Sequence, residues 1–171
     1  MSSHSNTHVS HSQGAPFKFT AENLAKYEEL LTRYDDVESA LLPVLHLVQE
    51  QNRWLPIEAI EYVSELMKIP EISIKEVISF YDMFYDIPVA RNMVHVCTNI
   101  TCSMFGGREI YQGLLKHFDT DYLTPTRDGR ISLQKMECLG ACEMAPCMRI
   151  NNDYVGPVDL VSAIHKLEEL P

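Results

Sequence analysis

The chain has 171 residues, of which 46% are hydrophobic, and a formal net charge of −10. This length accommodates one medium domain or two small ones, and the hydrophobic fraction is normal for a protein that buries a core. The negative charge argues against nucleic-acid binding, which depends on clustered Lys and Arg, and charges or prolines interrupt every apolar stretch well before the roughly 20 residues of a membrane-spanning helix.

The first 17 residues are rich in Ser, His and Asn and contain few apolar side chains. Too little apolar surface is present to offset the entropy lost on ordering, so we predict a flexible tail over residues 1–17 and assign no role to its histidines. The segment also lacks the basic start and apolar run of a secretory signal. We therefore expect a reducing compartment, in which cysteines remain thiols or bind metal.

Residues 18–88 are predicted to form a helical bundle domain. Apolar residues recur there at spacings of three and four, which places them on one face of each helix. A first helix begins near Thr20, a second carries Leu41 to Val48, and a third follows Pro56. Ser73 and Glu76 match a capping box and predict a fourth helix that ends near Tyr85.

Residues 89–171 combine strand and helix patterns. We predict strands over Met93–Cys97, Arg130–Met136 and Cys147–Ile150, and helices over Phe105–Phe118 and Val158–Leu170. This order, β-α-β-β-α, indicates a small sheet covered by helices. The predicted fold class is therefore α+β, with a helical N-terminal part and a sheet-containing C-terminal domain.

Four of the five cysteines form two pairs, Cys97-x4-Cys102 and Cys138-x3-Cys142, with 35 residues between the pairs. Each pair begins at the end of a predicted strand, where a rigid sheet can hold both loops around one point. Four thiolates are the ligands that a [2Fe-2S] cluster requires, two for each iron. The pattern predicts one such cluster, bound by Cys97, Cys102, Cys138 and Cys142.

A four-cysteine zinc site is the main alternative, in which the chain would be a zinc-stabilised interaction module. Zinc sites usually contain C-x-x-C pairs, so the x4 and x3 spacings favour the cluster, and a thioredoxin-type redox pair is absent. The fifth cysteine, Cys147, is predicted to be a small buried residue and not a ligand. No residue is predicted to perform acid-base catalysis.

The residues next to the cysteines suit a cluster. Gly106, Gly107 and Gly140 allow backbone N–H groups to approach sulfur, and a helix after Cys102 is predicted to favour its thiolate form. Four apolar residues are predicted to cover the centre: Met104, Phe105, Met144 and Ala145.

The cysteine spacings, the string ECLGACEMAPC at residues 137–147 and the stretch VISFYDMF at residues 77–84 carry a family resemblance. From residue 18 onward the sequence closely resembles the thioredoxin-like [2Fe-2S] ferredoxin subunit of the NADH-oxidising module of respiratory complex I. The resemblance implies a thioredoxin-like domain over residues 89–171 and the same four cluster ligands. The sequence departs from the family at Cys147, where an aliphatic residue or Met is more common.

The resemblance further implies an electron-transfer protein that exchanges single electrons with FMN in a partner flavoprotein during NADH oxidation and quinone reduction. A cluster cannot accept a hydride, and the Gly106-Gly107 pair lacks the spacing of a dinucleotide fingerprint, so FMN and NADH are expected on the partner. Further iron-sulfur subunits are expected, in a peripheral arm on the cytoplasmic or matrix face of the respiratory membrane, with membrane contact only through the assembly. Related subunits of NAD-linked hydrogenases and formate dehydrogenases remain alternatives.

Overall fold

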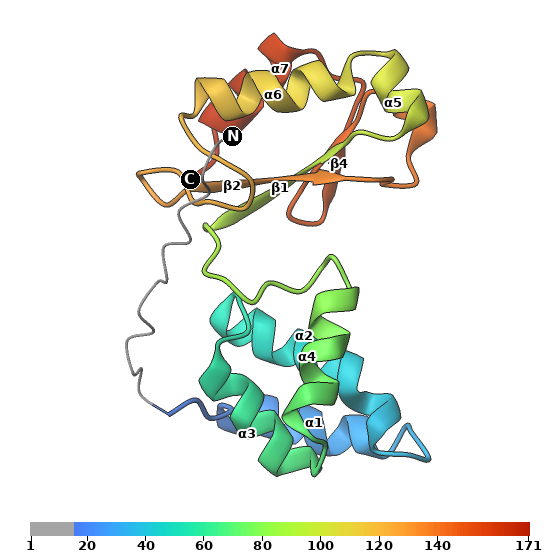
Figure 1. The fold of residues 1–171 in the computed structure, drawn as a ribbon, viewed down its shortest axis with the longest axis vertical. Coiled ribbons are helices and arrows are strands. Elements are labelled where there is room, and N and C mark those ends of the chain that lie inside the picture. Colours follow the sequence, from blue (N-terminus) through green and yellow to red (C-terminus); the bar gives the residue numbers. More distant parts are fainter. Residues whose placement is uncertain (1–15) are drawn as a thin grey trace, which may run out of the picture. The chain divides into compact units, whose positions relative to one another are not determined.

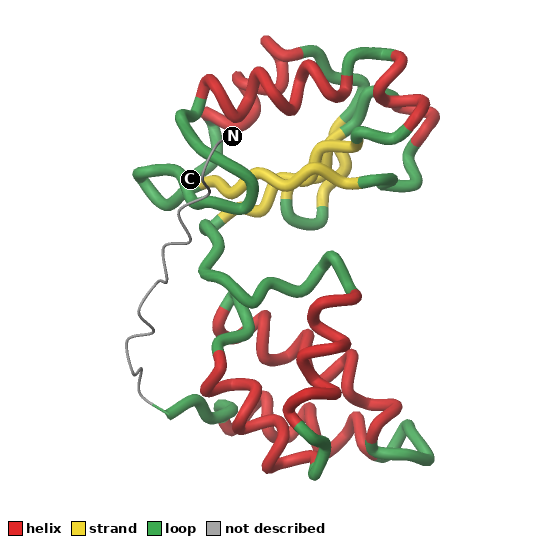
Figure 2. The backbone as a smooth tube through the Cα atoms, viewed as in Figure 1, coloured by secondary structure: helices red, strands yellow, loops and turns green. Residues whose placement is uncertain are grey.

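The computed structural model describes residues 16–171, so most of the predicted tail, residues 1–15, lies outside the described residues. The chain divides into two compact units, Met1–Ile87 and Pro88–Pro171, which are described separately below. The helices of the first unit precede the mixed helices and strands of the second along the chain (Figures 1 and 2), which confirms the predicted α+β class. Within residues 16–171, no helix is both long and apolar enough to cross a membrane.

The first unit contains the four predicted helices, preceded by Phe17 and Phe19, which pack on Tyr62. Their bounds are α1 Ala21–Leu31, α2 Leu41–Asn52, α3 Ile57–Met67 and α4 Glu71–Phe80, with a short 3-10 turn at Glu38–Ala40. The Thr20 side chain caps α1 by accepting from the Asn23 N–H. The core is made by the apolar faces of these helices, including Val44, Leu45, Val48, Val63 and Ile74.

The fourth helix differs from the prediction at both ends. It begins at Glu71 directly after Pro70, without a side-chain cap, so the predicted capping box at Ser73 and Glu76 is wrong. Proline fixes its own φ, here −58°, and suits a helix start without a capping side chain. The first helical turn therefore begins two residues before Ser73.

The segment after α4 leaves the helix and forms a turn at residues 82–83, where the Phe84 N–H donates to the Tyr81 carbonyl at 3.0 Å. The Gln49 side-chain amide donates to the Met83 carbonyl at 2.7 Å and accepts from the Tyr85 N–H at 2.9 Å. These contacts with α2 satisfy backbone groups that a continued helix would use internally, so α4 ends at Phe80 and not near Tyr85. Phe80 itself is 77% exposed, whereas Phe84 is buried in the helical core.

The second unit contains a four-stranded sheet in the order β2-β1-β3-β4. The strands are β1 Asn92–Cys97, β2 Ile131–Met136, β3 Met148–Ile150 and β4 Asp153–Val155. Strand β4 was not predicted; it pairs with β3 across the turn at Asn151. Strands β1 and β2 are parallel, and Cys97 lies opposite Met136. The carboxyl ends of these two strands are therefore adjacent; β1 ends at Cys97 and is followed by Cys102, and β2 leads into the segment that carries Cys138 and Cys142.

Three helices belong to this unit: α5 Ile100–Met104, α6 Gly107–His117 and α7 Leu160–Glu168. Helices α6 and α7 lie on one face of the sheet (Figure 1). The core between them includes Val94, Val96, Ile131, Leu133 and Met148 from the strands and Ile110, Leu114, Ala163 and Leu167 from the helices.

The helix predicted over Phe105–Phe118 corresponds to α6, and α5, which was not predicted, precedes it; Phe105 and Gly106 lie between the two helices. Gly106 has a φ of +91°, a conformation that glycine adopts at low cost. At Gly107 an added Cβ would lie 2.6 Å from the Cys97 carbonyl oxygen and 2.9 Å from that of Cys102. The chain therefore turns at one glycine and packs against the cysteine-bearing backbone at the next.

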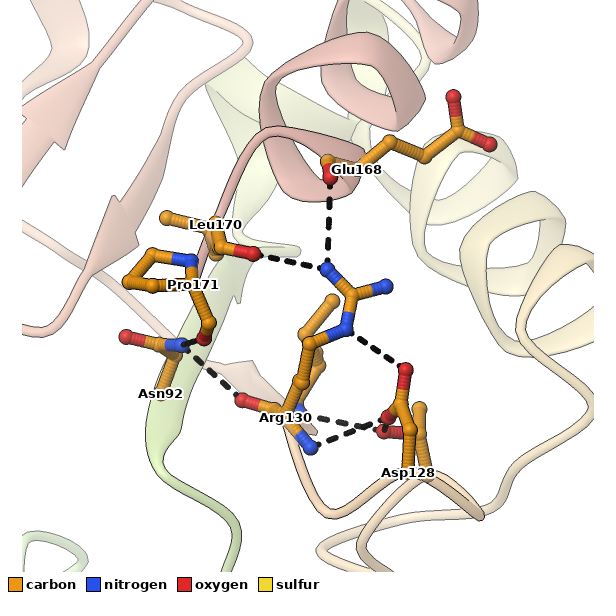
Figure 3. Close-up of polar contacts among 8 residues, drawn as sticks. Asn92, Asp128, Arg130, Glu168, Leu170 and Pro171 are labelled. Atoms are coloured by element: carbon orange, nitrogen blue, oxygen red, sulfur yellow. Dashed lines mark hydrogen bonds and ion pairs between the residues drawn. The ribbon is translucent and has the colours of Figure 1, made fainter.

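Arg130 joins the start of β2 to the end of α7 (Figure 3). Its guanidinium donates to the Leu170 carbonyl at 2.8 Å, to that of Glu168 at 3.3 Å and to Asp128 Oδ2 at 2.6 Å. The Asn92 side chain donates to the Arg130 carbonyl at 3.1 Å. This network links α7 to the amino-terminal ends of β1 and β2, at the end of the sheet opposite the cysteines.

Candidate metal centre

Three buried cysteines meet at the carboxyl end of β1. Cys97 ends β1, Cys102 lies in α5 and Cys147 directly precedes β3, and their Sγ atoms all lie within 4.8 Å of one another. The Sγ atoms of Cys102 and Cys147 are 3.8 Å apart. The Cys97 N–H donates to the Cys147 carbonyl at 3.1 Å, which continues the β1–β3 pairing.

The second cysteine pair, Cys138 and Cys142, is exposed on the loop that follows β2. Leu139 and Ala141 of this loop are buried in one cluster with the three inner cysteines. The Gly140 N–H lies 3.3 Å from Cys138 Sγ. The structure thus brings Cys97 and Cys102 together, places Cys147 beside them and packs the loop of the other two cysteines against this group. The assignment of all four ligands stays a prediction.

Backbone donors surround the sulfur of Cys97. Burial acts to raise the pKa of this thiol, but the N–H groups of Asn99 and Leu139 and the thiols of Cys102 and Cys147 donate to it, and its pKa lies below the ordinary value. Stabilisation of a thiolate by N–H donors is also what an anionic iron-sulfur centre requires.

The other two inner thiols behave differently. Burial raises the pKa of Cys102, against the opposing effect of the Cys147 N–H, which donates to its sulfur. Burial and the neighbouring sulfurs raise the pKa of Cys147 to about 12. The prediction that a following helix favours the Cys102 thiolate is wrong, because Cys102 lies inside α5 and burial dominates.

Only part of the predicted apolar cover packs on the inner cysteines. Met144 and Ala145 pack on the cysteine cluster, as predicted. Met104 and Phe105 are 79% and 64% exposed, so the prediction that they cover the centre is wrong for this chain. The short helix α5 ends at Met104, and these two side chains project towards solvent.

His95 lies two residues before Cys97, between Gln134 of β2 and Arg149 of β3. Burial and the positive charge of Arg149 lower the pKa of His95 to about 4, and the hydrogen bond with Gln134 opposes them. The imidazole is therefore neutral near pH 7, and Arg149 is the cationic group beside it.

Several groups that shape the site gave no signal in the sequence. The N–H donors of Asn99 and Leu139 are backbone atoms, which any residue type could supply. The Tyr154 hydroxyl of the unpredicted β4 donates to the Leu139 carbonyl at 3.0 Å. Cys147, in contrast, was noted in the sequence as a fifth cysteine. Its predicted burial is confirmed, because the residue is 1% exposed.

The donor set of this site suits a soft metal or an iron-sulfur centre. Thiolates select zinc, copper(I) and iron-sulfur clusters, whereas hard cations prefer oxygen ligands. The buried Cys97–Cys102 pair, the N–H groups directed at sulfur and the close approach of Gly107 provide the features that tune such clusters.

Comparison with known proteins places these observations in a family context. The family model described as "Thioredoxin-like [2Fe-2S] ferredoxin" matches residues 27–171. The chain is 38% identical over 157 residues to an NADH-quinone oxidoreductase subunit of Rickettsia bellii, covering 88% of this chain and 94% of that protein. It is 37% identical over 158 residues to "NADH dehydrogenase [ubiquinone] flavoprotein 2, mitochondrial" of Dictyostelium discoideum, covering 91% of this chain. It spans 64% of that relative, less than two thirds of its length.

A solved structure shares the fold. A chain of an NAD+-reducing [NiFe]-hydrogenase in the air-oxidized state superposes with a TM-score of 0.64 at 24% sequence identity. The match covers 75% of this chain and 23% of the hydrogenase chain. At this identity the likeness concerns the arrangement of helices and strands.

Proposed function

Because this chain belongs to the thioredoxin-like [2Fe-2S] ferredoxin family, we propose that Cys97, Cys102, Cys138 and Cys142 hold one [2Fe-2S] cluster and that the protein transfers single electrons. The observation that carries this proposal is the packing of the Cys138–Cys142 loop, through Leu139, onto the buried Cys97–Cys102 pair. The segments at two adjacent strand ends thereby supply four thiolates, the ligand set that such a cluster requires.

The residues around the four ligands have distinct roles in this proposal. A bound [2Fe-2S] cluster accepts and releases one electron at a time. The N–H groups of Asn99 and Leu139 stabilise negative charge on the Cys97 sulfur, and burial of Cys97 and Cys102 excludes water from that side. Cys138 and Cys142 occupy the exposed side, where an electron-transfer partner has the shortest approach.

The relatives support a place in an NADH-oxidising assembly. The Rickettsia relative is named as a subunit of NADH-quinone oxidoreductase. NADH releases a hydride, which requires a flavin before single electrons reach a cluster. We therefore assign this chain to an NADH:quinone oxidoreductase as an electron carrier without its own hydride-transfer site. Its partners are an FMN- and NADH-binding flavoprotein and further iron-sulfur subunits, in the peripheral arm on the cytoplasmic or matrix face of the membrane.

A second candidate is the equivalent component of an NAD-linked hydrogenase, favoured by the shared fold with the [NiFe]-hydrogenase chain. The sequence identities of 37% and 38% to NADH dehydrogenase subunits favour the respiratory assignment. Purification of the native assembly distinguishes the two, since hydrogenase large and small subunits co-purify only in the second case.

Electron paramagnetic resonance of the dithionite-reduced chain, with iron, sulfide and zinc analysis, tests the cluster itself. We expect one unpaired electron and two irons and two sulfides per chain, as the [2Fe-2S] composition requires. Cys138→Ala is expected to abolish the signal and leave the helical unit folded by circular dichroism. One zinc per chain and no resonance signal would contradict the electron-transfer function and support a zinc-stabilised interaction module instead.

A further inference from the structure

The inner half of the site contains three buried thiols, although the proposed cluster takes only two ligands there. Resting on the proposed function, we propose that Cys147 is a reserve iron ligand, whose sulfur can take the place of Cys102. Cys147 thus substitutes for Cys102 beside Cys97, while the exposed Cys138 and Cys142 have no such substitute among the described cysteines.

Sulfur spacing is the first argument. Two thiolates on one tetrahedral metal ion, with bonds near 2.3 Å, lie about 3.8 Å apart. In this proposal the Cys97 sulfur shares the metal with one of the other two, and the Sγ atoms of Cys102 and Cys147 both lie within 4.8 Å of it. The Cys102 and Cys147 sulfurs are 3.8 Å from each other, so they are neighbouring alternatives for the next coordination position of a metal held by Cys97.

The backbone around Cys147 is held by several independent contacts. Its carbonyl accepts from the Cys97 N–H at 3.1 Å, and the next residue, Met148, pairs with Val96 of β1. On the other side, an added Cβ at Gly156 would lie 3.1 Å from the Cys147 Cβ. None of these contacts involves the Cys102 side chain, so they continue to hold the Cys147 backbone when Cys102 is substituted.

The chemistry of the exchange balances without another reactant. With a cluster bound, the iron bond to Cys102 would break and one to Cys147 would form, and the Cys147 thiol proton would pass to the departing Cys102 sulfur. The exchange involves no oxidation or reduction, and the number of thiolate ligands stays at four. In a chain without Cys102, the Cys147 proton is released to solvent when the metal binds.

Four variants of the full chain test this inference: Cys102→Ala, Cys147→Ala, the double variant and Cys138→Ala as the matched control. We expect Cys102→Ala to retain two irons and two sulfides with an altered resonance line shape, since one ligand has changed. The double variant and Cys138→Ala are expected to lose bound iron by roughly tenfold or more. Circular dichroism reports whether each variant is folded.

The outcomes separate this inference from the proposed function. A folded Cys102→Ala chain that is as poor in iron as the double variant overturns the reserve ligand, provided the wild-type chain holds its cluster. A wild-type chain without iron overturns the proposed function instead.

If Cys102→Ala does not fold, Cys102→Ser replaces it. Resonance Raman spectra of Cys102→Ser should then show all-thiolate ligation, and those of Cys102→Ser/Cys147→Ala should show an oxygen ligand. Identical spectra for these two variants contradict the inference.

Discussion

The Tyr154 hydroxyl donates to the Leu139 carbonyl at 3.0 Å and so connects β4 to the loop between Cys138 and Cys142. The Leu139 N–H in turn donates to the Cys97 sulfur. One residue of the loop is therefore held from both sides, by the edge of the sheet and by an inner ligand.

Tyr154→Phe should loosen this loop and leave the rest of the unit unchanged. Loss of one hydrogen bond costs about 1 kcal/mol, and we expect several-fold faster release of iron to a chelator with an unchanged far-ultraviolet spectrum. Tyr34→Phe, at an exposed tyrosine of the helical unit, is the control. Equal release rates in the two variants would show that this hydrogen bond does not restrain the loop.

Gly107→Ala should lower the iron content of the cluster site, whereas Gly106→Ala should leave it unchanged. The new Cβ at Gly107 meets the carbonyl oxygens of Cys97 and Cys102 at 2.6 and 2.9 Å, so both ligand-bearing backbones must shift. Such overpacking costs roughly 1–3 kcal/mol, and iron content should fall. At Gly106 the Cβ meets open space, and the φ of +91° costs about 1 kcal/mol, so iron content should be retained. Denaturant titration and iron analysis check both; equal iron loss in the two variants would contradict the steric argument.

Cys147→Ala should lower the reduction potential of the bound cluster. In the wild-type chain the Cys147 thiol, whose pKa is raised to about 12, remains protonated 3.8 Å from the Cys102 sulfur. Loss of this weak donor should remove about 0.5–1 kcal/mol of stabilisation from the reduced cluster, which carries the greater negative charge. For one electron, this lowers the reduction potential by roughly 20–40 mV. Cys147→Ser keeps a donor and should shift less in a redox titration. An upward shift in the alanine variant would refute the donor role.

Asp128 should contribute a pH-dependent part of the stability. The Thr126 hydroxyl and the Arg130 guanidinium hold the pKa of its carboxyl well below the ordinary 3.8. A carboxyl with a lowered folded-state pKa stabilises the fold above its unfolded value, and this stabilisation is lost as the pH falls below about 3.8. Unfolding of Asp128→Asn should therefore depend less steeply on pH in this acid range than unfolding of the wild type. Asp119→Asn, at a widely exposed ion pair with Arg127, is the control and should change little.

Local sequence patterns determined the helices of the first unit, strands β1 to β3 and helices α6 and α7 of the second, and the positions of the cysteine pairs. These features depend on residues three or four positions apart, or on alternation within one strand, so they can be recognised without the fold. The same locality explains the errors. The capping box at Ser73 was a valid local pattern, but Pro70 begins the helix earlier, and contacts from Gln49 end it at Phe80.

Only the tertiary structure decided which sulfurs and donors meet. Cys102 and Cys147 are 45 positions apart and come within 3.8 Å because β3 pairs with β1, while Leu139 reaches Cys97 because β2 lies parallel to β1. Spacing along the chain identified the two cysteine pairs. It carries no information about which atom a backbone N–H donates to, or about a thiol such as that of Cys147, which strand pairing places beside the first pair. Those contacts arise from strand pairing between distant segments, whose order and register are settled by the packing of the whole domain.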